Sequence, residues 1–308
     1  MAGRLQVGIM ELIVNRQEGK RVAVRRLKPK NDFIFQRLFG EQDTKESLIS
    51  LLNAILQLQG TESIADITVI ENKQLDKLFI DDKTGRLDVR AETLDGVQFD
   101  IEIQLANQRN MPRRTLFYAS KLYISSIKAG GKYEDLKKTV AINLLDFHLF
   151  SFERFHSTFH FYEDHEERFM LTDAMELHFI EYPKFANMKK NLNNPLHRWL
   201  LFLDEKLPEE QLEELIRMDP VIKKAEERLE WLSSDEETLR LYEAREHSLI
   251  ERNSLIAEGK AQGRAEGRAE GKKEIAKQML AKGLEPALIA ELTGLPLDEI
   301  REMAKNGG

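Results

Sequence analysis

The sequence predicts an α/β fold in which helices flank a mixed sheet and a helical C-terminal region follows. Two segments with helical spacing come first, hydrophobic residues then alternate with period two, and one helix-period segment separates two groups of strands. The 308 residues, 42% of them hydrophobic, are enough to bury a substantial core. We expect a basic extension over residues 1–26, the core over 27–190, a helical region over 191–256, and a glycine-repeat helix with a small helical pair over 257–308.

Two helices open the predicted core. Asn31 and Asp32 are typical cap residues for a helix that begins at Phe33. A second helix covers about residues 45–58, where leucine and isoleucine recur at helical spacing, and Gly60 closes it.

Strands follow these helices. Residues 67–71 begin the sheet, and residues 87–92 alternate between apolar and polar side chains. Asp95-Gly96 is a strong hairpin signal, and the strictly alternating residues 99–105 come directly after it. The later elements are a helix over 113–129, a strand over 140–147, and two strands over 155–162 and 175–180 that form a hairpin.

The C-terminal region is predicted to be one long helix and a short helical pair. Ser233-Ser234, followed by two glutamates, is a capping box for a helix that runs to Lys282. Gly283 and Pro286 end this helix. Residues 286–304 are spaced as in a helix-turn-helix, but three acids near the start of the second helix would repel phosphates. We therefore favour packing or self-association for this pair over the reading of DNA sequence.

A repeat with a period of four covers residues 258–272, so each residue type falls on its own stripe of a helix. Each interior glycine costs about 1 kcal/mol relative to alanine, and like charges on one stripe add small penalties. A closely packed partner helix would offset these costs, which favours a homodimer or other homo-oligomer over a flexible linker or a DNA-binding arm. The stripes are Gly259, Gly263, Gly267 and Gly271; Lys260, Arg264, Arg268 and Lys272; Ala261, Ala265 and Ala269; and Glu258, Gln262, Glu266 and Glu270.

Composition excludes several classes of protein. The absence of cysteine excludes disulfide scaffolds, cysteine zinc sites and cysteine nucleophiles, and agrees with the cytoplasmic location that we expect. No apolar run approaches the roughly 20 residues that span a membrane. The chain has a net charge of −7, whereas residues 1–30 carry eight Lys or Arg against two Glu. This basic extension is either a solvated tail or an arm that touches DNA, and Met10 is an alternative start.

Two carboxylates in the predicted hairpin point to a metal site. Residues two apart on a strand share a face, so Asp100, Glu102 and Gln104 lie together, opposite an apolar face. The Asp95-Gly96 turn brings Asp88 toward Glu102. Two carboxylates and a backbone carbonyl form a hard oxygen site that suits Mg²⁺, which activates water and stabilises charge on a phosphodiester. The alternative is that these acids belong to a solvated outer face of the sheet.

A series of motifs extends this interpretation. They are Lys30-Asn31-Asp32-Phe33-Ile34-Phe35 with Phe39-Gly40, Arg86-Leu87-Asp88-Val89-Arg90-Ala91, Phe99-Asp100-Ile101-Glu102-Ile103-Gln104, Arg113-Arg114 with Tyr118, and Gly131 with Tyr133 and Leu136. In this order they resemble the Rpn-type recombination-promoting nucleases, also called PD-(D/E)XK family transposases. The resemblance covers about residues 27–185, and the glycine-repeat tail is also similar to the family.

The resemblance implies a PD-(D/E)XK fold and a Mg²⁺-dependent DNA endonuclease linked to recombination or a mobile element. It makes Asp88 and Glu102 the metal ligands. Gln104 stands where the wider superfamily has lysine, as is common in this family, and orients a water. Asp32 is either an accessory acid or only a helix cap. A non-catalytic DNA-binding or scaffold protein, and an RNase or structure-specific nuclease, are the alternative functions.

The predicted DNA contacts lie on the helix after the core strands. Arg113 and Arg114 are placed at its N-terminus, where phosphate contacts are plausible, although a partly exposed helix end is an equal alternative. Lys121, further along the same helix, is a candidate for the positive charge that Gln104 does not supply.

Overall fold

The computed structural model describes residues 26–70, 89–107, 109–128 and 130–306. The chain divides into two compact units, one up to Tyr242 and one from Glu243 onward. Residues 1–25 of the predicted basic extension (1–26) and the predicted ligand Asp88 lie outside the described residues.

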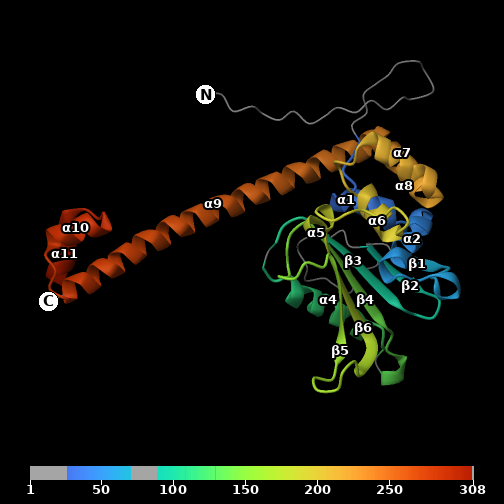
Figure 1. Cartoon of the computed structure of the whole chain (residues 1–308), viewed down its shortest axis with the longest axis horizontal. Helices are drawn as coiled ribbons and strands as arrows, with labels where there is room; N and C mark the ends of the chain where they lie inside the picture. Colours follow the sequence, from blue (N-terminus) through green and yellow to red (C-terminus); the bar gives the residue numbers. More distant parts are fainter. Residues whose placement is uncertain (1–25, 71–88, 108, 129, 307–308) are drawn as a thin grey trace, which may run out of the picture. The chain divides into compact units, whose positions relative to one another are not determined.

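The first unit combines helices with one sheet (Figure 1). Its strands are β1 (Ile67–Ile70), β2 (Val89–Thr93), β3 (Gln98–Gln104), β4 (Thr139–Leu145), β5 (His156–Tyr162) and β6 (Met170–Glu181). Its helices are α1 (Asp32–Phe39), α2 (Lys45–Leu56), α4 (Met111–Ser125), α5 (Tyr182–Ala186), α6 (Pro195–Phe202), α7 (Glu209–Met218) and α8 (Pro220–Ser234), with short 3₁₀ turns at Gln42–Thr44, Gly60–Glu62 and Tyr133–Asp135. Among the described elements, the predicted order of two helices, three strands, one helix and three strands is confirmed.

The sheet has the order β1-β2-β3-β4-β6-β5. Strands β1, β2 and β3 pair antiparallel, whereas β3 pairs with β4, and β4 with β6, in parallel. Strand β5 returns antiparallel to β6, as the predicted hairpin requires. Gly96 has a φ of 89° in the turn between β2 and β3, a conformation that favours glycine. The mixed sheet predicted from the sequence is therefore confirmed.

The two faces of the sheet bury different cores. Phe99 and Ile101 of β3 and Ile142 of β4 pack into a large core with α1, α2, α6 and α8. On the opposite face, Ala141 and Phe179 join a smaller core with α4. Because side chains alternate along each strand, the polar residues of β3 face the α4 side.

The helices after residue 190 belong to the large core. Trp199 of α6 and Leu229 of α8 are fully buried there, and Trp199 Nε1 donates a hydrogen bond to Ser50 Oγ at 3.0 Å. Buried side chains on both sides of residue 190 thus share one core. A boundary near residue 190 stays a prediction.

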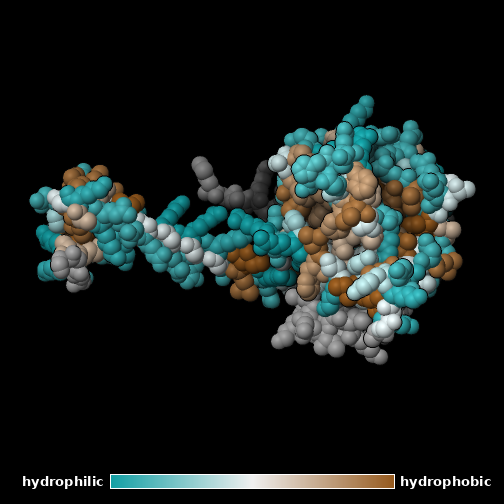
Figure 2. Space-filling view, turned by 90° about the horizontal axis from the view of Figure 1, so that it is seen from below, coloured by the Kyte–Doolittle hydropathy of each residue, from teal (hydrophilic) through white to brown (hydrophobic). Residues whose placement is uncertain are grey.

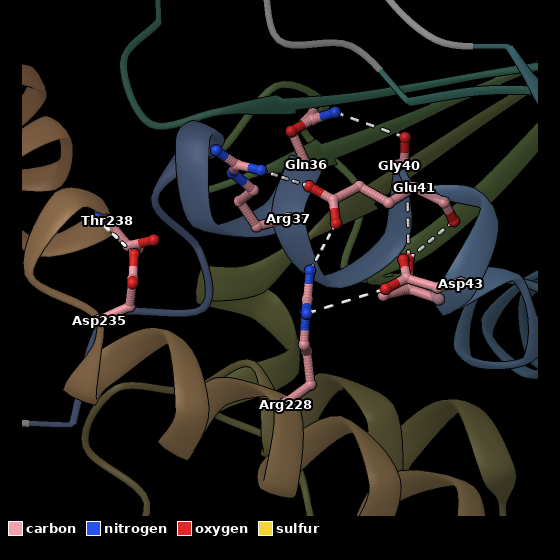
Figure 3. A network of polar contacts seen from close by, with 9 residues as sticks. Gln36, Arg37, Gly40, Glu41, Asp43, Arg228, Asp235 and Thr238 are labelled. Atoms are coloured by element: carbon pink, nitrogen blue, oxygen red, sulfur yellow. Dashed lines mark hydrogen bonds and ion pairs between the residues drawn. The ribbon is translucent and has the colours of Figure 1, made fainter.

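Ion pairs also join α8 to the N-terminal helices (Figure 3). The Glu41 carboxylate, just after α1, accepts hydrogen bonds from Arg37 at 2.7 Å and Arg228 at 2.5 Å. Arg228 also lies 3.8 Å from an Asp43 carboxylate oxygen. One carboxylate therefore links α1 to α8 across 187 residues of sequence.

Helix ends differ in detail from the sequence prediction. Asn31 caps α1 by accepting hydrogen bonds from Phe33 N and Ile34 N, so the helix begins at Asp32, one residue earlier than predicted. Helix α2 ends at Leu56, and the residue that closes it is Gln57, which has a φ of 58°, and not Gly60. Its C-terminal turn closes through a hydrogen bond from Gln57 N to Asn53 O, before the chain reaches the glycine.

The predicted capping box at residues 233–234 is wrong. Ser233 Oγ donates to Leu229 O inside α8 and is not available as a cap. Asp235 instead accepts a hydrogen bond from Thr238 N at 2.8 Å, and bonds from Thr238 hold the pKa of this carboxyl below its usual value. The next helix, α9 (Glu236–Ala281), therefore begins immediately after this aspartate.

The second unit ends in three packed helical segments. The end of α9 packs with α10 (Pro286–Thr293) and α11 (Leu297–Asn306) through Ala276, Ile289 and Ile300. The predicted end of α9 is confirmed: Gly283 has a φ of 79°, and α10 begins at Pro286. Gly294 has a φ of 68° in the turn between α10 and α11. Across the described part of the chain, the helices all lack an apolar stretch of the length needed to cross a membrane.

Candidate nuclease site

Glu102 lies in the middle of the sheet. Strand β3 is flanked by β2 and β4, and the Glu102 side chain is buried on the α4 side. A buried carboxylate is costly unless charges and hydrogen bonds compensate it. The groups around Glu102 therefore determine what it can do.

Arg114 supplies the compensating charge. Its guanidinium donates a short hydrogen bond to Glu102 Oε1, and both side chains are about nine-tenths buried. The next residue, Thr115, donates from Oγ1 to Asn143 Oδ1 at 2.9 Å and anchors α4 to β4. Asn143 is the register partner of Glu102 on the neighbouring strand, so this anchor holds Arg114 beside the carboxylate.

Gln104 acts on the same carboxylate. Its Nε2 donates to Glu102 Oε1 at 2.8 Å, so the amide orients Glu102. Two donors thus hold Oε1, whereas Oε2 has no hydrogen bond within the described residues. Oε2 therefore lies at the edge of a buried ion pair, and a carboxylate oxygen of this kind suits a hard divalent cation such as Mg²⁺.

The surroundings of Asp88 are described only on one side. Strand β2 begins at Val89, which pairs with Ile101, the neighbour of Glu102. Asp100, two residues before Glu102, forms a buried ion pair with Arg90 at a distance of 2.9 Å. Asp100 is therefore committed to linking β2 with β3, and the predicted metal ligands remain Asp88 and Glu102.

The other predicted site residues lie at different distances from this centre. Asp32 is the first residue of α1, on the opposite side of the sheet from α4, and its Oδ1 accepts a hydrogen bond from Phe33 N at 2.9 Å. Arg113 is exposed at the start of α4. Lys121 lies two turns beyond Arg114, with Nζ 5.9 Å from the centre of the Phe117 ring. The roles of Asp32, Arg113 and Lys121 stay predictions.

Sequence reasoning missed a polar group at the ends of β3 and β4. Lys30 Nζ donates to Asp146 Oδ1 at 3.1 Å and lies 4.7 Å above the Tyr182 ring. Asp146 N in turn donates to Gln104 O at 2.9 Å, at the carboxyl end of β3. Burial, with the charges of Asp204 and Asp146, raises the Tyr182 pKa well above its usual value. Lys30 begins the first of the motifs that carry the family resemblance, but its partner Asp146 is 116 residues away in the sequence.

A second polar cluster lies on β5 and β6. His156 Nε2 lies 2.9 Å from His178 Nδ1, and His178 Nε2 lies 2.8 Å from Glu176 Oε1. Burial, and then the charge of His178, lowers the pKa of His156 to about 4. The hydrogen bond from His178 is the main cause that lowers the pKa of Glu176 to about 2. These groups bind one another, and the described residues contain no set of three acids or histidines arranged to hold a metal.

The position of Gln104 gives a testable division of roles. Gln104→Ala should lower cleavage by roughly 10- to 100-fold, the range typical of groups that orient a metal ligand. Divalent-metal binding should persist, because Glu102 keeps its ion pair with Arg114. Isothermal titration with Mg²⁺ and a plasmid-nicking assay on the same preparation measure the two effects. Complete loss of metal binding in Gln104→Ala would contradict this assignment.

Comparison with known proteins identifies two regions. Residues 29–259 match the family described as PD-(D/E)XK nuclease family transposase. Residues 269–305 match the C-terminal helix-turn-helix domain of the Rpn/YhgA-like nuclease family. No curated protein and no solved structure matches the chain.

Proposed function

Because the chain belongs to the PD-(D/E)XK nuclease family of transposases, we propose that it is a Mg²⁺-dependent DNA endonuclease linked to recombination or a mobile element. The observation that carries this proposal is the buried Glu102, whose Oε1 is held by Arg114 and Gln104. Asp88 and Glu102 are the proposed metal ligands. A bound divalent ion supplies a water of lowered pKa and stabilises charge that develops on the phosphate.

The protein groups have separate roles in this proposal. Glu102 presents one oxygen to the ion, and Gln104 fixes the orientation of the carboxylate. Arg114 neutralises Glu102 before substrate arrives and lies at the proposed position of the phosphate. Arg113, exposed on the same turn, contacts the backbone of the strand, and Lys121 contributes further positive charge.

Supercoiled plasmid tests the proposed activity. With Mg²⁺ the full chain should convert supercoiled DNA to the nicked and linear forms, and EDTA should stop this conversion. A structured RNA, incubated in parallel, separates a DNA endonuclease from an RNase. Binding to plasmid without nicking at any Mg²⁺ concentration would favour a non-catalytic DNA-binding or scaffold protein that keeps the fold.

The C-terminal helices match a helix-turn-helix domain, which favours the DNA-reading alternative over a pair that only packs. The end of α9 provides the third helix that completes this domain, through Ala276 and its neighbour Met279. One of the acids that argued against DNA is partly neutralised, because Glu299 pairs with Lys273 at a distance of 2.7 Å. We propose that this domain binds DNA.

Self-association through α9 is the second part of the proposal. Every residue from 251 to 275 is exposed, and a Cβ added at Gly259, Gly263, Gly267 or Gly271 would meet only the glycine's own turn of the helix within 4 Å. An exposed helix with four interior glycines is weak alone, at about 1 kcal/mol for each glycine. A second copy, with its acidic stripe facing the basic stripe, would compensate for this cost and place two nuclease sites on one DNA duplex.

Mass measurement tests the association. The full chain should sediment as a dimer or larger oligomer, whereas a chain that ends after Ile256 should be smaller in assembly state. Analytical ultracentrifugation without DNA, over a wide range of protein concentrations, measures both. If both proteins are monomers throughout, the stripes do not mediate association, and the linker or DNA-arm alternatives take their place.

A further inference from the structure

An apolar groove lies beside the start of α4, on the face of the sheet that carries Glu102. It has a volume of about 250 Å³, just below the 300–1,000 Å³ typical of pockets for larger ligands. One wall of the groove is α4, and the opposite wall is the hairpin of β5 and β6. The segment after β4 contributes a further side chain. The side chains that shape it are Pro112, Leu116, Phe150, Phe159, Phe161 and Phe179.

Aromatic rings dominate this groove and remain open to solvent. Phe159 and Phe161 are 39% and 45% exposed, and Leu116 on the opposite wall is 42% exposed. The Phe150 ring lies 5.2 Å from that of Phe159 and 5.4 Å from that of Phe179. Exposed apolar side chains also form patches among polar ones on the first unit in Figure 2. Contiguous apolar surface of this kind marks a binding site.

The groove and the candidate nuclease site adjoin the same turn of α4 from different sides of the helix. Pro112 lines the groove, Arg113 is exposed beside it, and Arg114 contacts Glu102. A DNA strand that contacts the exposed Arg113 with a phosphate therefore lies beside the groove.

The other end of the groove also carries positive charge. Phe152 stacks on Phe150 with centroids 5.2 Å apart and an angle of 10° between the ring planes. The guanidinium of the exposed Arg154 lies 6.0 Å from the centre of the Phe152 ring. Lys184 Nζ lies 4.9 Å from the same centre, but it is buried and bound to Glu181 Oε2 at 2.5 Å. An exposed arginine thus lies near each end of the aromatic floor, Arg113 at one and Arg154 at the other, an arrangement that complements a phosphate backbone whose bases stack between them.

We propose that this groove holds an unpaired base of the DNA strand that enters the nuclease site. The inference rests on the proposed nuclease function and adds the form of its substrate: a strand that is single, unwound or locally flipped out of a duplex. Phenylalanine rings stack on any base, so the aromatic part of the groove reads no sequence. His160, the polar residue of the lining, has its Nε2 3.7 Å from Glu176 Oε2. Acidic residues 163, 164, 166 and 167 follow β5, so the strand runs from the groove toward Arg113 and not over the hairpin tip.

Photochemical crosslinking tests the position of the base. A short single strand that carries 5-iodouracil is irradiated with the full chain in EDTA, where the nuclease is inactive. Trypsin cleaves after Arg154 and Arg168, so an adduct in the groove appears on the peptide that covers residues 155–168. We expect that peptide, or the one that contains Phe150, to carry the adduct. The inference is wrong if all adducts fall on α10, α11 or the glycine repeat.

Matched variants in β5 test whether the base stacks on an aromatic ring of the groove. Phe161→Ala should weaken binding of the single strand by about tenfold, with duplex binding unchanged, because one base loses its aromatic partner. Phe161→Leu should weaken binding of the single strand by the same factor, since leucine keeps the apolar volume without the ring. Phe161→Trp keeps a ring for stacking and should bind as tightly as the unmodified protein. Tyr162→Ala is the control, because Tyr162 is similarly exposed at 47% and is not among the groove residues. Fluorescence anisotropy in EDTA measures the dissociation constants.

The outcomes separate this inference from the nuclease proposal. Full binding by Phe161→Leu, or a change of sedimenting mass in Phe161→Ala, would show an apolar protein contact and overturn the inference. Stronger competition by an RNA strand of the same sequence would overturn the assignment to DNA. Plasmid nicking without an adduct in the groove would reject the base site alone. An adduct without nicking would reject the proposed nuclease and support the base site.

Discussion

Glu102→Gln should abolish Mg²⁺-dependent nicking of supercoiled plasmid. The rate should decrease by more than about 100-fold, which exceeds the decrease typical when a group that only orients a metal ligand is removed. The substitution keeps the size and a hydrogen-bond acceptor for Arg114 but removes the counter-charge of that buried guanidinium, so the thermal unfolding of the variant is compared with that of the unmodified protein. It removes the negative charge that a divalent ion requires. Asp88→Asn should have the same effect, because the two carboxylates are the proposed ligands.

Glu92→Gln is the matched control for this experiment. Glu92 is a half-buried carboxylate on β2 of the same sheet, and it pairs with Gln98 at the opposite end of the hairpin. It should nick at the rate of the unmodified protein. The thermal unfolding of all variants in EDTA shows that each is folded. Nicking at the normal rate by Glu102→Gln or Asp88→Asn would remove that residue from the metal site.

Arg114→Met should strongly destabilise the protein in EDTA and much less in excess Mg²⁺. The variant leaves Glu102 buried without its cation, and breaking such a pair costs about 3–5 kcal/mol. For a unit of this size the cost corresponds to a decrease in melting temperature of roughly 10 °C. A divalent ion at Glu102 replaces the lost charge, so the stabilisation produced by Mg²⁺ should be larger in the variant than in the unmodified protein.

Two further variants make this result specific. The double variant Glu102→Gln with Arg114→Met removes both charges, so it should be more stable in EDTA than Arg114→Met alone and should gain little from Mg²⁺. Arg113→Met removes the neighbouring exposed arginine and should leave the melting temperature unchanged. Equal stabilisation by Mg²⁺ in Arg114→Met and in the double variant would place the ion away from Glu102. Differential scanning calorimetry provides all of these values.

The order of elements followed from the sequence because each has a clear period. Alternation over residues 99–105 placed Glu102 and Gln104 on one face, and the structure confirms this through the hydrogen bond between them. The turn at Gly96 and the end of α9 at Gly283 were equally visible, since both require a positive φ.

Contacts between distant segments were not predictable in the same way. Arg114 was expected to contact DNA, and only the packing of α4 on β3 and β4 places its guanidinium on Glu102. The pair of Lys30 and Asp146 joins the start of α1 to the end of β4, which no local pattern encodes. The helix-turn-helix spacing was recognised and agrees with the family match, but local sequence did not show that Glu299 pairs with Lys273, which lies on another helix.

The ion pair between Arg114 and Glu102 has a thermodynamic consequence. In the proposed site the arginine and a divalent ion would compete for one carboxylate, whereas a DNA phosphate and that carboxylate would compete for one arginine. A phosphate that drew Arg114 away would therefore strengthen ion binding, and by linkage the ion would strengthen DNA binding by the same factor. The two ligands would be mutually cooperative, so metal would accumulate at the site mainly when a strand is present to be cut.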